Sequence, residues 1–351
     1  MNNTETKEIF YERYGGADDF LHYTFCGALC TLLGHTDILG APFLSCSLSM
    51  GVGMFSRALG GNVTSLQSAV SDRHFSYTRG NPTAQFKGSE KQTAQLISEV
   101  GKYTKTGAQI LYNSSIPSAL PQKKEFRFAL TSALLSAGGR NMPPLETAYI
   151  ASGGEHIAPF TAMSYSRSGY CTLITDEGVT NYPLPMTGYK VVYAYCREKD
   201  NRIVDRVYDA LDVLRKHCGE LSVHSLNPAH ALLAGRVLSK SGARYIQHLA
   251  GENSRIKAAV RGLEGCDIKA LFHAMNASQH SMEKLWNIRR SHAFLARLAK
   301  NADGVAAVRC THGGAVIIAE SDKVDHMVRM IKSEFEYNMG YKPVFCITDT
   351  I

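Results

Sequence analysis

Hydrophobic positions recur along the chain with two different spacings. Helical spacing is clear in five stretches, residues 89–103, 125–137, 203–216, 227–241 and 268–277. Strand-like runs, rich in β-branched and aromatic residues, occupy residues 170–175, 189–196, 305–308, 315–319 and 343–347. The sequence Asp-Glu-Gly at residues 176–178 predicts a hairpin turn after the first of these strands. This mixture of helices and strands predicts an α+β protein.

The C-terminal part of the chain shows the pattern most completely. Two strands joined by a Gly-containing turn lead to Ser321, a residue type that often caps the start of a helix. Apolar residues at positions 324, 327, 328, 331 and 335 then form one helical face. Gly340 suits the position after the helix, and Pro343 opens a last strand. We therefore predict two strands, a helix and a final strand here.

Length and composition indicate a globular chain of about two domains. It has 351 residues, 44% hydrophobic and 20% charged, which is enough to bury a substantial core. A weak change in composition at residues 197–201 predicts a boundary between domains 1–200 and 201–351. The N-terminus lacks the features of a secretory signal, and no apolar run of about 20 residues is uninterrupted. We expect a soluble, cytoplasmic protein that does not enter a membrane.

Cysteine usage and charge exclude several classes of protein. The nine cysteines are scattered and odd in number, which indicates reduced thiols in a cytoplasm. Neither Cys26 with Cys30 nor Cys310 with His312 has a companion pair at zinc spacing, so we expect no metal site. The net charge of +7 is modest, and the basic residues between 239 and 300 have the spacing of solvated helix faces. Without stacking aromatics or a nucleic-acid motif, nucleic-acid binding is not expected.

Four segments, in order along the chain, resemble galactokinases, a family of the GHMP kinase superfamily. Residues 27–37 read G-A-L-C-T-L-L-G-H-T-D and align without a gap with the family's G-R-V-N-L-I-G-E-H-T-D. Residues 245–256 resemble its R-H-V-V-T-E-N-x-R-V helix, and residues 275–281 resemble its helical M-N-A-S-H-x-S. From Gly304 onward the chain is similar to the family's last motif and closing β-α-β unit. The resemblance implies a two-domain GHMP-kinase-like fold, with an N-terminal ribosomal-S5-like α/β domain and a C-terminal ferredoxin-like α+β domain.

The phosphate-binding segments depart from the family pattern. Galactokinases wrap ATP in P-x-G-x-G-L-S-S-S-A-A before a helix, because glycines expose backbone amides and the helix start favours negative charge. The equivalent residues 116–130 keep Pro117 but contain no glycine. The last glycine-rich loop, T-G-G-G-F-G-G-C in the family, is shorter here by about three residues. The remaining candidates for weak phosphate contacts are Lys123, Lys124, Thr311, Gly313 and Gly314.

The catalytic positions of the family carry other residues. The catalytic Arg that follows the first glycine of the family motif is Ala28 here, which removes a cation that would stabilise the transferring phosphoryl group. The Asp of C-G-x-M-D-Q corresponds to His156, in the segment 152–157. Histidine can act as a base, but the resemblance assigns no catalytic residue at either position.

The sugar-binding positions are better kept. The resemblance places His35, Thr36 and Asp37 at the family's H-T-D, where Asp37 corresponds to a carboxylate that bonds galactose hydroxyls, and Gly153 at a backbone contact to the sugar. The family Glu before H-T-D is Gly34 here. The sugar-contacting Tyr of Y-N-x-R-R has no clean match near residues 203–208. A turn inherited without a ligand, in which Asp37 caps backbone amides, is the alternative.

Three hypotheses follow. The first is a galactokinase-like protein with little or no kinase activity that binds galactose or a related sugar as a sensor or regulator, acting on a protein partner. The second is an active ATP-dependent sugar kinase that uses Mg-ATP, with His156 and the two lysines as substitutes. The third is a structural or interaction protein without a small-molecule ligand, since fold alone does not specify function.

Overall fold

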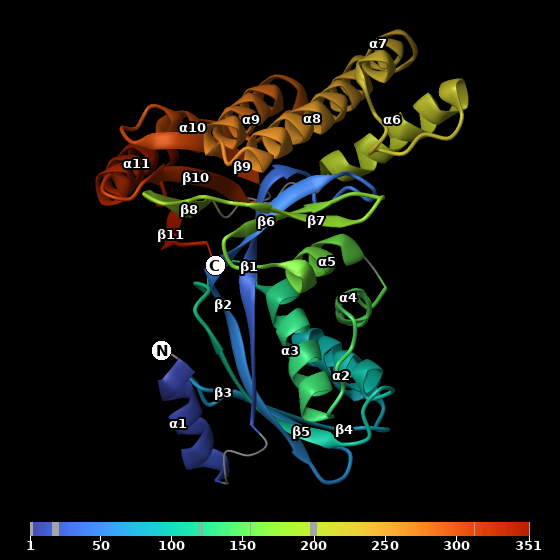
Figure 1. Ribbon diagram of the computed structural model, residues 1–351, viewed down its shortest axis with the longest axis vertical. Helices are drawn as coiled ribbons and strands as arrows, with labels where there is room; N and C mark the ends of the chain where they lie inside the picture. The colour runs from blue at the N-terminus through green and yellow to red at the C-terminus, as the bar shows by residue number, and fades with distance from the viewer. Residues whose placement is uncertain are drawn as a thin grey trace. The chain divides into compact units, whose positions relative to one another are not determined.

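The computed structural model describes residues 3–15, 21–118, 120, 122–154, 156–196, 202–311 and 313–350 (Figure 1). Contacts divide the chain into two compact units, Met1–Leu29 with Ser49–Tyr165 and Cys30–Leu48 with Ser166–Ile351. The segment 197–201, expected to mark the domain boundary, lies outside the described residues. The compact units divide the chain at 29/30, 48/49 and 165/166, and the strand at 189–195 pairs within the second unit. A boundary between domains 1–200 and 201–351 stays a prediction.

The first unit contains a mixed sheet in which β4, β3, β5 and β2 follow one another. β2 (Phe43–Leu59) pairs antiparallel with β5 (Gly107–Ser114) over residues 52–59. β5 pairs parallel with β3 (Val63–Ser68), which pairs antiparallel with β4 (His74–Thr78). β1 (His22–Gly34) pairs with β2, and both strands continue along the chain into the second unit.

Helices cover both faces of this sheet. They are α1 (Asn3–Tyr14), α2 (Gly88–Val100), α3 (Lys123–Ala137), α4 (Pro144–Ser152), α5 (Ile157–Tyr165) and the 3₁₀ turn η2 (Thr83–Gln85). Phe55 of β2 packs in a buried cluster with Phe10 of α1. The next residue, Ser56, donates a hydrogen bond to the carbonyl of Ala133 in α3. Because successive strand residues point to opposite faces, α1 and α3 lie on opposite sides of the sheet.

The second unit contains a four-stranded antiparallel sheet in the order β11-β8-β10-β9. Its strands are β8 (Tyr189–Tyr195), β9 (Val305–Thr311), β10 (Gly314–Glu320) and β11 (Val344–Thr348). β10 pairs with both β8 and β9, and β11 pairs with the other edge of β8. The first residues of β2 pair with β6 (Tyr170–Ile174), which forms a hairpin with β7 (Val179–Pro183).

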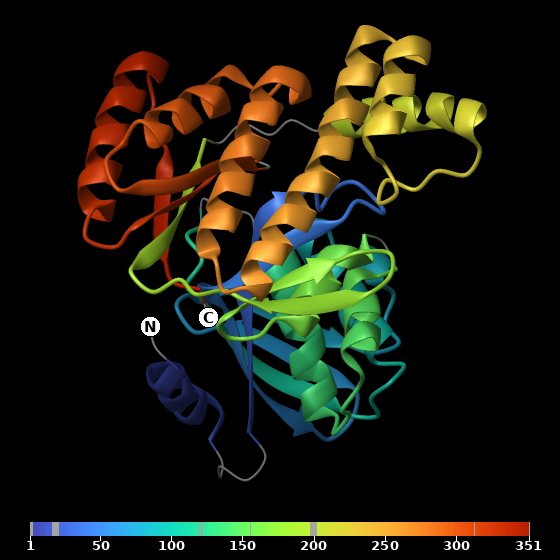
Figure 2. The ribbon, with the colours of Figure 1, turned by 45° about the horizontal axis from the view of Figure 1, so that its top comes forward.

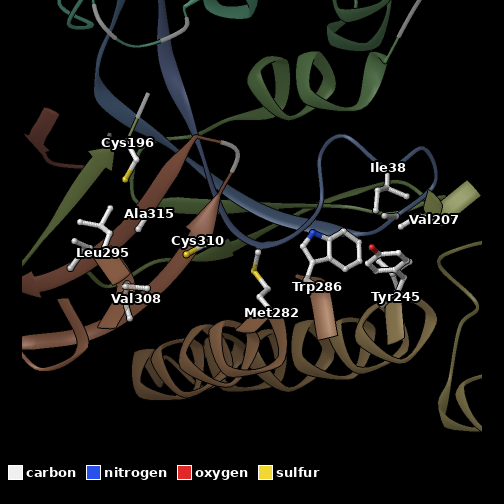
Figure 3. Close-up of a cluster of buried hydrophobic side chains, with 14 of the residues drawn as sticks. Ile38, Cys196, Val207, Tyr245, Met282, Trp286, Leu295, Val308, Cys310 and Ala315 are labelled. Carbon is white, nitrogen blue, oxygen red and sulfur yellow. The ribbon is translucent and has the colours of Figure 1, made fainter. Parts of the chain in front are cut away.

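Helices of the second unit pack on its four-stranded sheet and on one another (Figure 2). They are α6 (Arg202–Cys218), α7 (Pro228–Val237), α8 (Lys240–Glu264), α9 (Ile268–Ser281), the π-helical turn η3 (Met282–Trp286), α10 (Arg290–Lys300) and α11 (Val324–Met339). α8 lies along α9, and α9 and α10 contact β9. Ile246, Ile317 and Phe335 belong to one buried cluster, part of which Figure 3 shows.

The strands and most of the helices expected from the sequence are confirmed within a few residues, as is the turn at 176–178. The single helix over 227–241 is wrong. α7 ends at Val237 and α8 begins at Lys240, because Ser239 accepts a hydrogen bond from the Gly242 amide and starts a new helix. No helix among the described residues has the length and apolar composition needed to cross a membrane.

The expected caps of the last helix are half right. Ser321 is not the N-cap, because α11 begins at Val324 and Lys323 precedes it. The Ser321 amide instead donates a hydrogen bond to the carbonyl of Gly188. Gly340 ends the helix with a φ of +75°, as predicted from its lack of a side chain.

Candidate functional site

The H-T-D segment forms a turn between β1 and β2, within the second unit. β1 ends at Gly34, whose φ of +80° is uncommon for any other residue. A Cβ added there would lie 2.2 Å from the carbonyl oxygen of Pro42, so the position has no room for a side chain. His35 is buried, and Thr36 and Asp37 are half-buried. Local backbone geometry therefore sets the path of the turn.

A buried ion pair holds the backbone of Gly34 from two sides. Glu252 Oε1 accepts a hydrogen bond from the Gly34 amide at 2.8 Å, and Arg309 Nη2 donates one to the Gly34 carbonyl at 2.6 Å. Ser278 Oγ bridges the pair, donating to Glu252 Oε1 and accepting from Arg309 Nε, each at 2.9 Å. Burial would raise the pKa of Glu252, but Arg309 and Arg255 help to lower it well below its usual range. The carboxylate is therefore charged and the turn is fixed.

The ring of His35 has partners on two sides. Its Nε2 lies 2.9 Å from Nε2 of His248, whose Nδ1 lies 2.8 Å from Ser281 Oγ. The ring also stacks on Trp286, with centroids 4.3 Å apart and 24° between the planes. Burial lowers the pKa of His35 and of His248 to about 3. Both rings are therefore neutral near pH 7.

Trp286 itself belongs to the buried core of the second unit. It packs edge-on against Tyr245 of α8, with centroids 5.5 Å apart. Figure 3 shows Trp286 and Tyr245 among the side chains of this cluster, together with Ile38 from the turn. The stacking partner of His35 is therefore held by core packing.

The carboxylate of Asp37 has no hydrogen-bond donor or ion-pair partner among the described residues. Its charge nevertheless acts on the neighbouring His35. Two residues further on, the amide of Leu39 donates a hydrogen bond to the hydroxyl of Tyr208, on α6, at 2.8 Å. The sequence has no clean match to the family motif that carries a sugar-contacting tyrosine. The only indication of Tyr208 in the sequence was its place within the helix predicted at residues 203–216. The structure brings Tyr208 to the turn that bears Asp37.

The start of α3, in the first unit, carries a buried carboxyl group. Glu125 Oε1 accepts a hydrogen bond from the Leu29 amide at 3.3 Å, and its own amide also bonds the carboxyl group. Burial raises the pKa of Glu125. Lys123 and Lys124 are exposed on the same helical turn. The side chain of Glu125 therefore occupies its own backbone amide, at the helix end where the resemblance would place a phosphate, and the amide of Leu29 on β1.

The other candidates of the first unit lie around α3 or just after α4. Ala28 is buried on β1, next to the residue that bonds Glu125. Arg127 of α3 donates a hydrogen bond to the carbonyl of Ala151 near the end of α4. Gly153 follows with a φ of +71° and is exposed, and His156 is exposed with a φ of +45°. The sugar and catalytic roles suggested for Gly153 and His156 remain predictions.

The glycines of the shortened last loop have a packing explanation. Thr311 ends β9 opposite Gly314, the first residue of β10. A Cβ on Gly314 would lie 1.9 Å from the Ala194 carbonyl oxygen, and one on Gly313 would lie 2.8 Å from the ring of Tyr195. Neighbouring β8 therefore requires glycine at both positions, whether or not a phosphate binds. The phosphate contacts suggested for this loop remain predictions.

One group of side chains among the described residues has ligand atoms close enough to share a metal ion. Asp176, Glu177 and His224 place one such atom each within 4.8 Å of one another. Asp176 lies 3.3 Å from the His224 ring, a distance that suits an ion pair when that ring is protonated. Of the two cysteine pairings considered from the sequence, that of Cys310 includes His312, which lies outside the described residues.

The chain is similar in sequence to known galactokinases. The chain is 28% identical over 199 residues to a galactokinase of Clostridium acetobutylicum, covering 51% of this chain and 50% of the relative. It therefore spans about half the length of the curated relatives it matches. No protein-family profile matches the chain.

The fold is similar to solved structures over nearly the whole chain. A galactokinase of Lactococcus lactis, complexed with galactose, aligns with a TM-score of 0.85 and 17% identity over 99% of this chain and 97% of that one. A mevalonate kinase of Methanococcus jannaschii aligns with a TM-score of 0.66 and 11% identity over 95% of this chain and all of that one. The galactokinase resemblance and the GHMP-kinase-like α+β fold expected from the sequence are confirmed.

Proposed function

We propose that this galactokinase-like chain binds galactose or a related sugar at the turn of residues 34–37 and transfers little or no phosphate. The observation that carries the proposal is the carboxylate of Asp37. It is half-buried and has no partner among the described residues, while the backbone three residues earlier is held by the ion pair of Glu252 and Arg309. An acceptor close to a fixed backbone, with no donor among the described residues, suits an external hydroxyl group.

The chemistry of the turn supports a sugar in particular. A carboxylate accepts hydrogen bonds from two neighbouring hydroxyls, and such charge-assisted bonds are stronger than neutral ones. The hydroxyl of Tyr208 and the neutral ring of His35 add groups that can donate or accept near the same turn. The Lactococcus lactis relative was solved with galactose, which makes this the first sugar to test.

The residues that would hold Mg-ATP do not fit it. A nucleotide needs backbone amides for its phosphates, but the carboxyl group of Glu125 already accepts hydrogen bonds from its own amide and that of Leu29. The Leu120 amide donates to the carbonyl of Pro117, within the same segment. Ala28 supplies no cation. These features support weak or absent phosphoryl transfer, and we derive no step through a nucleotide.

Sugar binding is tested by calorimetry and by thermal unfolding with a panel of hexoses. A ligand present at 100 times its Kd stabilises the protein by about 2.7 kcal/mol. We expect such a shift for wild type and a loss of affinity of at least about tenfold in Asp37→Asn, because a bond to a charged group contributes about 1.5–3 kcal/mol. The matched control, Asp322→Asn, changes an exposed carboxylate and should bind as wild type does. Absence of any shift across the panel contradicts the proposal.

An active sugar kinase is the second candidate, favoured by the curated relatives, which are galactokinases. It predicts ADP release with magnesium, ATP and a sugar at about 1 per second or faster. We expect no such turnover, and none after Ala28→Arg or His156→Asp alone, because catalytic groups act as a unit. Turnover by wild type at that rate contradicts our preferred function.

A role as sensor or regulator adds a protein partner and a cytoplasmic location to the proposal. The partner would distinguish the sugar-bound from the free chain. If neither a sugar nor a nucleotide binds, the purely structural hypothesis replaces ours.

A further inference from the structure

One short segment of the second unit, residues 281–286, is linked to His35 at both ends. Its last residue contacts the His35 ring directly, and its first residue contacts it through His248. Ser281, the last residue of α9, contacts the His248 ring, which bonds His35. Trp286 ends the π-helical turn that follows and stacks on His35 directly. The next residue, Asn287, has a left-handed φ of +54°. π-Helical turns often occur at functional sites, and this one brings Trp286 against His35, whose hydrogen-bond partner His248 contacts Ser281.

The hydrogen bonds from Ser281 to His35 must all run in one direction. A neutral imidazole has one nitrogen that donates and one that accepts. If Ser281 donates to His248 Nδ1, then His248 Nε2 donates to His35 Nε2, and the proton of His35 is on Nδ1. If His248 Nδ1 donates to Ser281, then His35 Nε2 is the donor and its Nδ1 becomes an acceptor. A serine hydroxyl serves in either role, so the chain can adopt both arrangements.

We propose that Ser281 and His248 are positioning residues that couple the tautomer of His35 to the direction of their hydrogen bonds, so that its Nδ1 donates to a sugar hydroxyl in one arrangement and accepts from it in the other. This inference rests on the proposed function and deepens it, because it names the ligand group as a hydroxyl. A hydroxyl both donates and accepts, so it fits either arrangement of the chain. Trp286 keeps the ring of His35 in its plane while the proton changes sides.

The surroundings of His35 support a role beyond packing. Packing alone would be satisfied by an apolar ring, yet the chain places two imidazoles and a hydroxyl in series inside the unit. His35 precedes Asp37 by two residues, and the carboxylate charge acts on its ring. A change at the sugar-binding turn is therefore transmitted to the end of α9 through two hydrogen bonds.

The coupling is tested first without a sugar. Nitrogen-15 NMR distinguishes protonated from unprotonated ring nitrogens, and the signals are assigned by their loss in His35→Gln and His248→Gln. We expect Ser281→Ala to change the tautomer populations of His35, two residues away along the hydrogen bonds. Ser281→Thr keeps the hydroxyl and should restore the wild-type spectrum. Ser254→Ala is the control, because Ser254 is exposed on α8 and bonds its own helix. Unchanged His35 signals in Ser281→Ala overturn the proposal.

The second arm uses the sugar and the single tryptophan of the chain. We expect bound sugar to shift the emission of Trp286 in wild type and in Ser281→Thr. In Ser281→Ala we expect sugar affinity to fall about fivefold, the equivalent of one hydrogen bond of about 1 kcal/mol. Binding by calorimetry with unchanged emission overturns the coupling but leaves the proposed function standing. Absence of binding contradicts the proposed function, and the NMR arm still decides the coupling.

Discussion

The galactokinase resemblance assigns a function to two regions of the molecule. Each of these regions contains a buried carboxyl group, but the two groups act in opposite ways. At the turn of residues 34–37, buried Glu252 bonds the backbone and leaves Asp37 without a partner among the described residues. At the start of α3, buried Glu125 bonds its own amide, at the helix end where the resemblance would place a phosphate, and the amide of Leu29 on β1. A buried carboxyl group can therefore either leave a neighbouring acceptor available to a ligand or itself occupy the groups that a ligand would contact. Sequence likeness alone does not separate the two outcomes.

The largest effect is expected from breaking the ion pair that fixes the turn. Removing one partner of a buried pair leaves the other charge uncompensated and typically costs about 3–5 kcal/mol. Glu252→Ala should therefore lower the free energy of unfolding by this amount in urea titrations, and Arg309→Ala should do the same. Lys323→Ala, which breaks an exposed pair with Asp303, should change stability little. A small effect of Glu252→Ala would show that the turn is held by other contacts.

The second-largest effect is expected from acid, which should destabilise the same region. The unfolded histidines bind protons below about pH 6.5, whereas the pKa of folded His35 and His248 is about 3. The unfolded state therefore binds more protons between these values, and stability declines as the pH falls from 6.5 toward 3. At pH 5 each uncoupled ring would cost about 2 kcal/mol relative to pH 7.

Urea titrations at pH 7, 6 and 5 measure this slope. Wild type should lose stability steadily, and His248→Gln should show a shallower loss because one titrating ring is gone. Glu252 does not contribute in this range, since its folded pKa is lowered and its unfolded pKa lies below pH 5. A flat profile in wild type would contradict the neutral histidine pair.

A smaller effect is expected at the filled helix end. Glu125→Ala removes the acceptor of the Leu29 amide, and an unsatisfied buried donor costs about 1–3 kcal/mol. Glu125→Gln keeps an acceptor oxygen and should lose less. Neither variant should gain a thermal shift with Mg-ADP, because residues 116–130 still contain no glycine. A clear shift in Glu125→Ala would show that this carboxyl group alone excludes the nucleotide.

The smallest effect is expected at the lysine beside that helix end. Lys123 is exposed on the first turn of α3. Lys123→Ala should change the free energy of unfolding by less than about 0.5 kcal/mol, as most surface substitutions do. It should leave sugar affinity unchanged in the same calorimetric assay. A loss of sugar affinity would show that Lys123 takes part in sugar binding, which would contradict a sugar site at the turn of residues 34–37.

Local patterns predicted much of the second unit, and long-range pairing explains what they missed. The strands at β8 and β10 and the amphipathic face of α11 follow from spacing within single segments. β1 and β2 were not predicted, because their apolar run is interrupted by His35, Asp37 and Pro42, which lie at the turn between them, and by several glycines, some of them within the strands. Strand pairing across the sheet stabilises them, and no local window contains that information.

The candidate site was predicted only where a motif is contiguous. The segment His35 to Asp37 was identified as the end of the contiguous motif at residues 27–37. Arg309, which bonds Gly34 at a separation of 275 positions, carries no sequence signal of that contact. Glu125 was read as part of an altered loop, and its burial depends on the amide of Leu29, which lies 96 positions earlier. The sequence shows the type and charge of these residues, but it does not show which residues they contact.

Gly34 limits how this protein can change further. Its left-handed backbone and the closeness of Pro42 exclude any side chain, so a carboxylate like that of the galactokinase motif cannot be reinstated there by one substitution. The segment that follows the turn would first have to move, and the bonds from Glu252 and Arg309 would have to form anew. A carboxylate introduced at this position alone would therefore disrupt the turn before it could contact a ligand.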